Sequence, residues 1–200
     1  MYLYGIGGNE VRLMEGDTTG RTREIRRLKQ SAATQFEPLP DGAVCLIPAQ
    51  GRSISIIGRP GKRDTTWPVP DWIEMGSISH SPDAKSLAVV GVNRSNDSVV
   101  VATVDIESGR FTRTGVFPGS DAPRIMWLED RSIMAIFREP RGAWVFYRIR
   151  PGRPAERLGT LPHTRADFSV SSDGKHVAMF SYSDKNDVYM IRNFGQMLRR

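Results

Sequence analysis

A short turn built around an aspartate occurs four times in this chain, each time between two apolar runs. The four acidic turns are LPDGA (39–43), SPDAK (81–85), LEDRS (128–132) and SSDGK (171–175). Their aspartates, Asp41, Asp83, Asp130 and Asp173, follow one another at intervals of 42, 47 and 43 residues. Repeats of roughly 40 to 50 residues made of strands are typical of β-propeller blades. The spacing predicts an all-β fold with propeller architecture.

A second marker repeats with the same period. Glycines at the expected outer turns are spaced 41, 48, 43 and 43 residues apart: Gly20, Gly61, Gly109, Gly152 and Gly195. Because two independent markers share one period, the chain is expected to consist of successive equivalent units.

Each unit is expected to contain four antiparallel strands, which we call a, b, c and d in chain order. Strand a precedes the acidic turn, and strand b follows it. Strands b and c are nearly continuous apolar runs, such as SLAVVGV (86–92) and VVVATV (99–104), and such runs indicate burial on both faces. Strand d, for example FTRTGVF (111–117), is more polar. This gradient favours stacked blades over a sandwich with one solvated face per sheet.

One propeller region is expected over residues 1–200. Its predicted blades are 1–29 (partial, outer strands), 30–72, 73–119, 120–162 and 163–200 (lacking an outer strand). An N-terminal d strand that completes the last blade would close a ring of four. The N-terminus also has a c-like strand that such closure leaves spare, so we expect about four blades forming an open arc or a fragment of a six- to eight-bladed ring. Exposed blade edges in such an arc would permit self-association.

Composition restricts the class of protein further. Hydrophobic residues make up 39% of the chain and charged residues 25%, which suits a folded core. No apolar run is long enough to cross a bilayer, and no signal peptide is recognised at the N-terminus. The single cysteine, Cys45, lies inside an apolar run and is expected to be a buried, inert thiol. The sequence leaves the cellular compartment undetermined.

The net charge of +6 raises the question of a nucleic-acid partner. Arginines and lysines recur at the outer part of each repeat, as in the segments 21–27, 59–63 and 110–113. A nucleic-acid site would collect basic residues on one face together with stacking aromatics. The distribution indicates a solvated rim, and no nucleic-acid partner is expected.

Antiparallel order places the a–b and c–d turns at one end of each sheet and the b–c and d–a connections at the other. We call the second end the loop side. Its connections vary in length and content, which is typical of binding loops on a rigid scaffold. Candidate binding residues there are Trp67, Trp72, Asp121, Arg141, His163 and Arg165. Packing beneath a connection, or hydrogen bonding within a loop, is the alternative role for each; the four turn aspartates are expected to be structural.

Signatures of catalysis are missing from the sequence. It contains no G-x-S-x-G, HExxH or paired CxxC motif, and GRPGKR (58–63) lacks the glycine spacing of a P-loop. Neither His80 nor His176 has another ligand at metal-binding spacing. The sequence therefore predicts no enzyme, no cofactor and no metal.

The segments SPDAK, SSDGK and SYSDKNDVYMIRNF (181–194) resemble the propeller repeats of the TolB family, which are also WD-repeat-like. The resemblance covers about residues 30–194, and LEDRS departs from it by lacking the proline and glycine. It implies a non-enzymatic, bacterial scaffold that binds protein or peptide partners through its variable loops. The alternative is a C-terminal sensory or gating propeller of a larger signalling kinase, regulator or prolyl oligopeptidase-type peptidase. An autonomous enzyme such as a glycosidase or lactonase is the least favoured reading.

Overall fold

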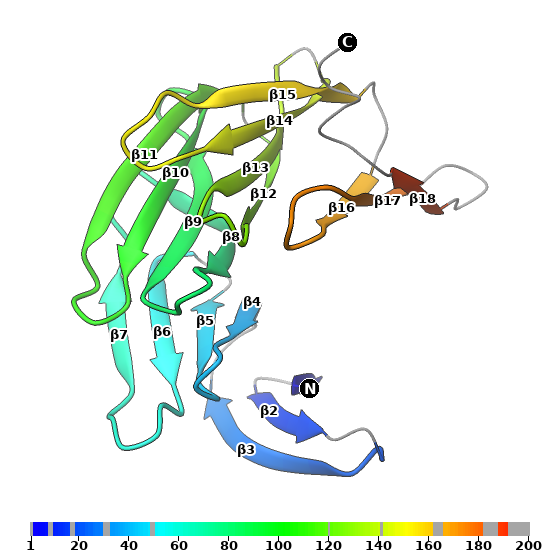
Figure 1. Cartoon of the computed structure of the whole chain (residues 1–200). Helices are drawn as coiled ribbons and strands as arrows, with labels where there is room; N and C mark the ends of the chain where they lie inside the picture. The colour runs from blue at the N-terminus through cyan, green and yellow to red at the C-terminus, as the bar shows by residue number, and fades with distance from the viewer. Residues whose placement is uncertain are drawn as a thin grey trace. The chain divides into compact units, whose positions relative to one another are not determined.

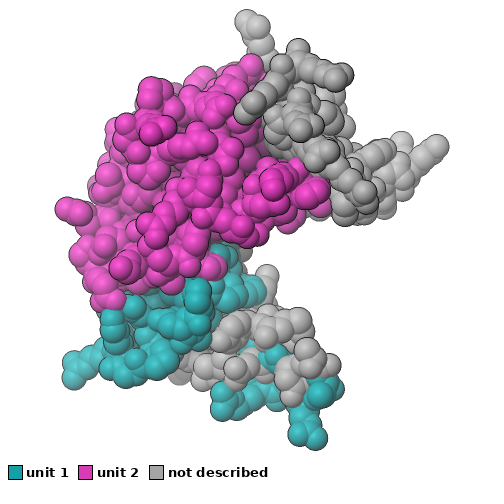
Figure 2. Space-filling view, viewed as in Figure 1, with its two compact units in different colours: residues 1–70 teal, residues 71–200 magenta. Residues whose placement is uncertain are grey.

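The computed structural model describes residues 2–7, 10–16, 19–29, 33–48, 51–119, 121–140, 142–161, 166–181 and 188–191. Contacts divide the chain into two compact units, residues 1–70 and 71–200 (Figure 2). The described residues form strands, turns and bends, with no helix and hence no helical membrane span among them. The predicted all-β class is confirmed.

Unit 1 contains two sheets. The first has the strand order β1–β2–β3 and the second β4–β5–β6–β7 (Figure 1). The strands are β1 (Tyr2–Gly7), β2 (Glu10–Gly16), β3 (Thr22–Lys29), β4 (Ala33–Pro38), β5 (Val44–Pro48), β6 (Ser53–Ile57) and β7 (Thr65–Pro68). Within each sheet, every strand pairs antiparallel with the next strand in the chain.

Unit 2 contains three sheets, ordered β8 to β11, β12 to β15 and β16 to β18 (Figure 1). The strands are β8 (Glu74–His80), β9 (Ser86–Asn93), β10 (Ser98–Asp105), β11 (Phe111–Pro118), β12 (Asp121–Trp127), β13 (Ile133–Arg138), β14 (Trp144–Ile149), β15 (Glu156–Leu161), β16 (Ala166–Val170), β17 (Val177–Ser181) and β18 (Val188–Ile191). All neighbouring strands are antiparallel and consecutive, which is the up-and-down order expected for propeller blades.

The N-terminal sheet has one strand more than the sequence indicated. The segment 10–29 was expected to supply two outer strands alone. Residues Tyr2–Gly7 add β1, which pairs with β2 along its whole length. Three glycines in the first eight residues concealed this strand, because glycine is unfavourable in strand interiors.

The β12–β15 sheet is buried on both faces, as its apolar strands predicted. On one face, Ile133 and Phe137 of β13 pack with side chains of β9, β10 and β11. On the other, Met134 and Ile136 of the same strand pack with residues of β16 and β17. Alternating residues of a strand point to opposite faces, so one strand contributes to both interfaces. The sheet therefore stacks between its two neighbours, as a propeller blade does.

Three aromatic rings fill the interface between the β8–β11 and β12–β15 sheets. The ring of Tyr147 lies 4.6 Å from that of Phe117 and stacks on that of Phe137 at 5.3 Å, measured between centroids. Aromatic rings bury large apolar areas, and their contacts add to stability beyond the area buried. They fix the outer part of this interface.

Two of the acidic turns form a leucine class. The N–H of Leu39 donates to the carbonyl of Ala43, and the N–H of Leu128 donates to the carbonyl of Ser132, both at 2.8 Å. Both leucines are buried. LEDRS thus has the same backbone hydrogen bond as LPDGA, although it lacks the proline and the glycine.

The other two turns form a serine class, in which the loop is one residue longer. The N–H of Ser81 donates to the carbonyl of Ser86 at 2.8 Å, and the N–H of Ser171 donates to the carbonyl of His176 at 2.9 Å. The classes alternate along the chain.

The residue after the aspartate has a positive φ in every acidic turn. The values are 84° at Gly42, 52° at Ala84, 62° at Arg131 and 69° at Gly174. This left-handed conformation favours glycine because it has no Cβ. It explains the Asp-Gly pair in two of the turns and places mild strain in the other two.

Candidate interaction site

Each aspartate of the leucine-class turns binds an arginine from later in the same sheet. Asp41 accepts hydrogen bonds from the N–H of Ala43 at 3.1 Å and from Nε of Arg59 at 3.2 Å. In the other sheet, Nη2 of Arg148 donates to Oδ2 of Asp130 at 2.7 Å. The arginine follows the aspartate by 18 residues in both cases. The equal spacing supports a structural role for these aspartates.

The aspartates of the serine-class turns accept hydrogen bonds from within the turn. Oδ1 of Asp83 accepts from the hydroxyl of Ser81 at 2.7 Å and from the N–H of Lys85 at 3.2 Å. Asp173 accepts the equivalent bonds from the hydroxyl of Ser171 at 2.6 Å and from the N–H two residues after itself at 2.9 Å. Such local bonds are those of Asx turns.

These contacts favour the ionised form of three of the turn aspartates, Asp83, Asp130 and Asp173. Hydrogen bonds from serine hydroxyls and backbone N–H groups lower the pKa of Asp83 and of Asp173. Partial burial acts to raise the pKa of Asp130, but the bonds from Ser132 and the charge of Arg148 outweigh it, and its pKa is also lowered. A carboxylate held in this state is an acceptor and is poorly suited to act as a general acid near neutral pH.

The acidic turns of unit 2 are linked to one another. Nη2 of Arg131 lies 3.8 Å from Oδ2 of Asp83. The N–H of Glu129 donates to the carbonyl of Ser172 at 2.9 Å, and the hydroxyl of Ser172 donates to Oε1 of Glu129 at 2.5 Å. These contacts join three successive sheets at the end that carries the acidic turns.

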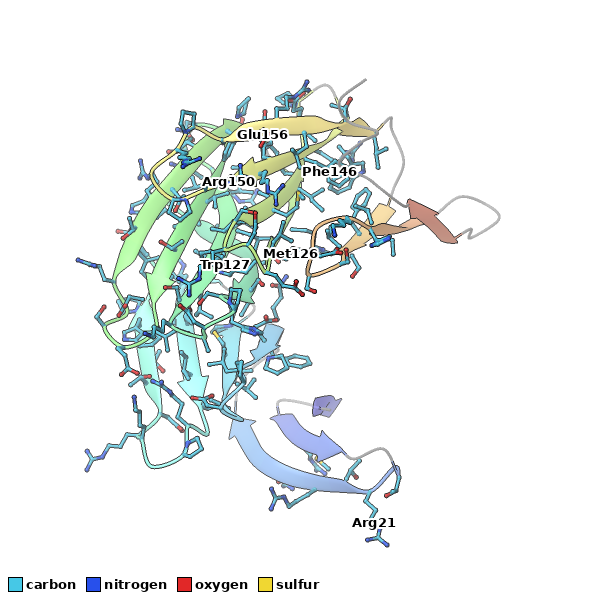
Figure 3. All side chains as sticks on the ribbon, viewed as in Figure 1. Arg21, Met126, Trp127, Phe146, Arg150 and Glu156 are labelled. Carbon is cyan, nitrogen blue, oxygen red and sulfur yellow. The ribbon has the colours of Figure 1, made fainter. Side chains whose placement is uncertain are left out.

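No candidate metal centre appears in the part of the chain that the structure describes, where no three His, Cys, Asp or Glu side chains cluster. Several acidic and basic groups there form pairs, such as Arg150 and Glu156 at 3.3 Å (Figure 3). Cys45 is fully buried, and burial raises its pKa, so the thiol is inert at neutral pH as expected.

Trp67 was expected in a loop, and that placement is wrong. It lies in β7, opposite Ile54 of β6, and its side chain is half-buried. Pro68, the last residue of this edge strand, gave the segment the appearance of a loop, although proline is tolerated at strand edges.

Trp72 lies in the connection that leads into β8, as predicted, and its indole contacts an arginine. The guanidinium of Arg113, on β11, sits 4.5 Å from the centroid of the Trp72 ring. The indole is half-buried, whereas Arg113 is exposed. A cation over an indole face is attracted by the ring quadrupole, which holds both side chains in place.

Ile73, the residue after Trp72, holds the connection against the same sheet. A Cβ added to Gly91 of β9 would lie 2.7 Å from Cγ1 of Ile73 and 2.1 Å from the carbonyl oxygen of Glu74. Only glycine leaves room for this approach. Gly91 pairs with Val100, and Arg113 pairs with Ala102, so both contacts lie on one face of the β8–β11 sheet.

Val116 completes a small exposed patch on this face. Its side chain is 48% exposed, and it is the one large hydrophobic residue exposed to this degree within the described ranges. It pairs with Val100, which places it on the face that carries Arg113. We call Trp72, Arg113 and Val116 the edge patch. The sequence assigned β11 to a polar rim and gave no signal that these three residues come together.

The b–c connection of the same sheet carries an exposed ion pair. Nε and Nη2 of Arg94 donate to the two carboxylate oxygens of Glu74 at 2.6 and 3.1 Å. Because both side chains are more than half exposed, the pair orients the loop side but adds little stability.

The remaining candidates lie largely outside the described residues. Asp121 was expected in a connection but is the first residue of β12, opposite Arg138; its side chain is not described. Arg141, His163 and Arg165 fall outside the described ranges. The structure therefore places two of the six candidates, Trp67 and Trp72, with their side chains.

Comparison with family models gives no match, and comparison with curated proteins gives none either. Solved structures of similar fold include a hydrazine synthase from Kuenenia stuttgartiensis, with a TM-score of 0.73 and 16% identity over 99% of this chain and 63% of that one. TolB from Acinetobacter baumannii matches with a TM-score of 0.67 and 15% identity, over 92% of this chain and 46% of that one.

An oligogalacturonate lyase determined with manganese also matches, with a TM-score of 0.70 and 14% identity over 96% of this chain and 56% of that one. The chain thus spans from about half to just under two thirds of the length of these three proteins. At such identities the likeness concerns the fold alone. The chain has a TolB-like β-propeller fold, and this fold is shared by TolB, lyases and a synthase.

Proposed function

We propose that the chain is a non-enzymatic propeller module that binds a protein or peptide partner through the loop side of its blades. The stacked sheets supply a rigid support, and the connections supply the contact residues. The acidic residues that repeat along the chain serve the turn end and leave recognition to other side chains.

The edge patch carries this proposal: Trp72 lies in a loop-side connection, and Arg113 and Val116 lie on the adjoining face of β11. Tryptophan and arginine are the residue types enriched at the energetic centres of protein interfaces. Here the Arg113 guanidinium, 4.5 Å from the Trp72 ring, lies on the same sheet face as the exposed Val116. Side chains already held by one another lose less conformational entropy when a partner binds.

The non-enzymatic part of the proposal rests on the state of the aspartates. The lowered pKa values of Asp83, Asp130 and Asp173, and their bonds within turns, suit acceptors that hold structure.

The test is selection of a displayed random peptide library on the immobilised chain, followed by titration of the recovered peptides. We expect binding to the native chain and at least a tenfold loss of affinity in the Trp72→Ala variant, at an unchanged strand-rich circular dichroism spectrum. The matched control is Arg153→Ala, an exposed turn residue at the other end of its sheet. Failure to recover any peptide, or equal affinity for the native and Trp72→Ala chains, would refute the proposed function.

A further inference from the structure

We propose that the partner contributes an extended acidic segment that pairs with the outer edge of β11 and extends the β8–β11 sheet by one strand. This inference rests on the proposed function and specifies the chemistry of the partner. Addition of a strand to a sheet edge is a general mode of peptide recognition, with affinity from backbone hydrogen bonds and specificity from alternate side chains.

The other outer strands of complete sheets are protected against such pairing. β7 has only four residues, half the length of β11, and both strands end at a proline, Pro68 and Pro118. β15 begins with Glu156 and Arg157, both held in ion pairs, the first with Arg150 at 3.3 Å and the second with Glu139 at 3.4 Å. Short length, proline and charge are the usual devices that keep sheet edges from pairing.

β11 is less protected. It is eight residues long, and among the described strands it pairs with β10 alone. Its surface residues include Thr112 and the 48% exposed Val116, where a protected edge would carry paired charges. Alternate residues of an edge strand direct N–H and C=O groups outward, so β11 offers a row of backbone partners.

The charge of this edge selects the partner. The segment 110–118 contains two arginines, Arg110 and Arg113, and no acidic residue. Both arginine side chains are exposed. A second copy of the chain, with a net charge of +6, would bring like charges together. An acidic segment complements the edge and is favoured over self-pairing.

The side-chain pattern of the segment follows from the register of β11. Arg113 lies opposite Ala102 and Val116 opposite Val100, so both point to the sheet face that Trp72 occupies. Residues i and i+2 of an added strand would meet them in turn. On the face that meets Arg113 and Val116, the segment is therefore expected to carry an acidic side chain at one residue and an apolar side chain two residues away.

The probe is a capped synthetic peptide that repeats glutamate, threonine, valine and threonine, which places glutamate and valine on one face of an extended strand. Titrated into the isotope-labelled full chain, it should slow hydrogen exchange at alternate amides of residues 111–117 at least tenfold. Amides of β15 provide the internal control and should not change.

Two further arms test the mechanism. The Arg113→Glu variant should lose at least tenfold in affinity for the glutamate peptide and regain it for a peptide with lysine in place of glutamate. A peptide N-methylated at every residue cannot donate to the edge, and it should not bind the native chain; this arm leaves the protein unaltered.

The inference is overturned if the glutamate peptide fails to bind while library peptides do bind, since the proposed function would then stand without it. Binding without protection of residues 111–117, or unaffected by N-methylation, overturns it equally. Dimerisation of the chain through β11, seen by sedimentation and abolished by Val116→Lys, would assign the edge to a second copy and also contradict it.

Discussion

The guanidinium of Arg148 lies 2.7 Å from the carboxylate of Asp130 and ties an acidic turn to the third strand of the same sheet. In another sheet, Arg59 lies in the turn after the third strand and contacts Asp41 at 3.2 Å, again 18 residues apart. In the serine-class turns, Val101 and Ile191 stand 18 residues after the aspartates, and serine hydroxyls supply the hydrogen bonds instead. The equivalent aspartate is therefore bound by a distant arginine in the leucine class and by a serine of its own turn in the serine class.

The ion pair between Asp130 and Arg148 should be measurable as a coupling energy. In a double-mutant cycle with Asp130→Ala and Arg148→Ala, we expect the two variants to be less than additive by about 1 kcal/mol, in the upper range for partly exposed pairs. Urea denaturation provides the free energies. A cycle that pairs Asp130→Ala with Arg153→Ala is the control and should show no coupling; additivity in both cycles would contradict a stabilising pair.

Acid should destabilise the protein through the turn aspartates. The pKa values of Asp83, Asp130 and Asp173 lie below their ordinary value of 3.8 in the folded state. Their stabilisation is therefore fully present above that value and is lost as pH falls through the lower folded pKa values. The free energy of unfolding, measured from about pH 6 to about pH 2, should fall mainly below pH 3.8.

An Asp83→Asn, Asp173→Asn variant identifies the source of that loss. Asparagine does not titrate, so the variant should be less stable near neutral pH and should lose less stability on acidification. If the free energy of unfolding falls with pH as steeply in the variant as in the native chain, other carboxyl groups cause the acid sensitivity.

Replacement of Gly174 by alanine should cost more stability than replacement of Gly152. Both glycines have left-handed φ angles, 69° and 74°, so both alanine variants incur backbone strain. A Cβ at Gly174 would also lie 2.8 Å from Cδ1 of Leu128, whereas a Cβ at Gly152 meets nothing within 4 Å. Thermal melts should therefore rank Gly174→Ala below Gly152→Ala. Equal melting temperatures would mean that Leu128 moves aside freely.

Most of the fold was predictable because it depends on local patterns. The acidic turns and the apolar runs of strands such as β9 and β13 specify a four-stranded repeat without any knowledge of distant contacts. β1 and β7 were missed because glycine and proline weaken the strand signal, while pairing with β2 and β6 overrides that local preference.

The edge patch was less predictable because it depends on tertiary register. A shift in the pairing of β11 with β10 between Val101 and Ala102 places Arg113 and Val116 on the same sheet face although they are three residues apart. The close approach of Ile73 to Gly91 then brings Trp72 to the same sheet face. Sequence reasoning found Trp72 from its residue type and its loop, but it assigned Arg113 to a solvated rim.

Photo-crosslinking locates the partner on the chain and shows whether it binds at the edge patch. A photoreactive amino acid in place of Val116 should crosslink to a library-selected peptide on illumination, whereas the same group in place of Arg153 should not. Both sites are exposed, so the comparison isolates position. A crosslink at position 116 that disappears in the Trp72→Ala background is the predicted result. Equal crosslinking at the two positions, or crosslinking at position 153 alone, would contradict binding at the edge patch.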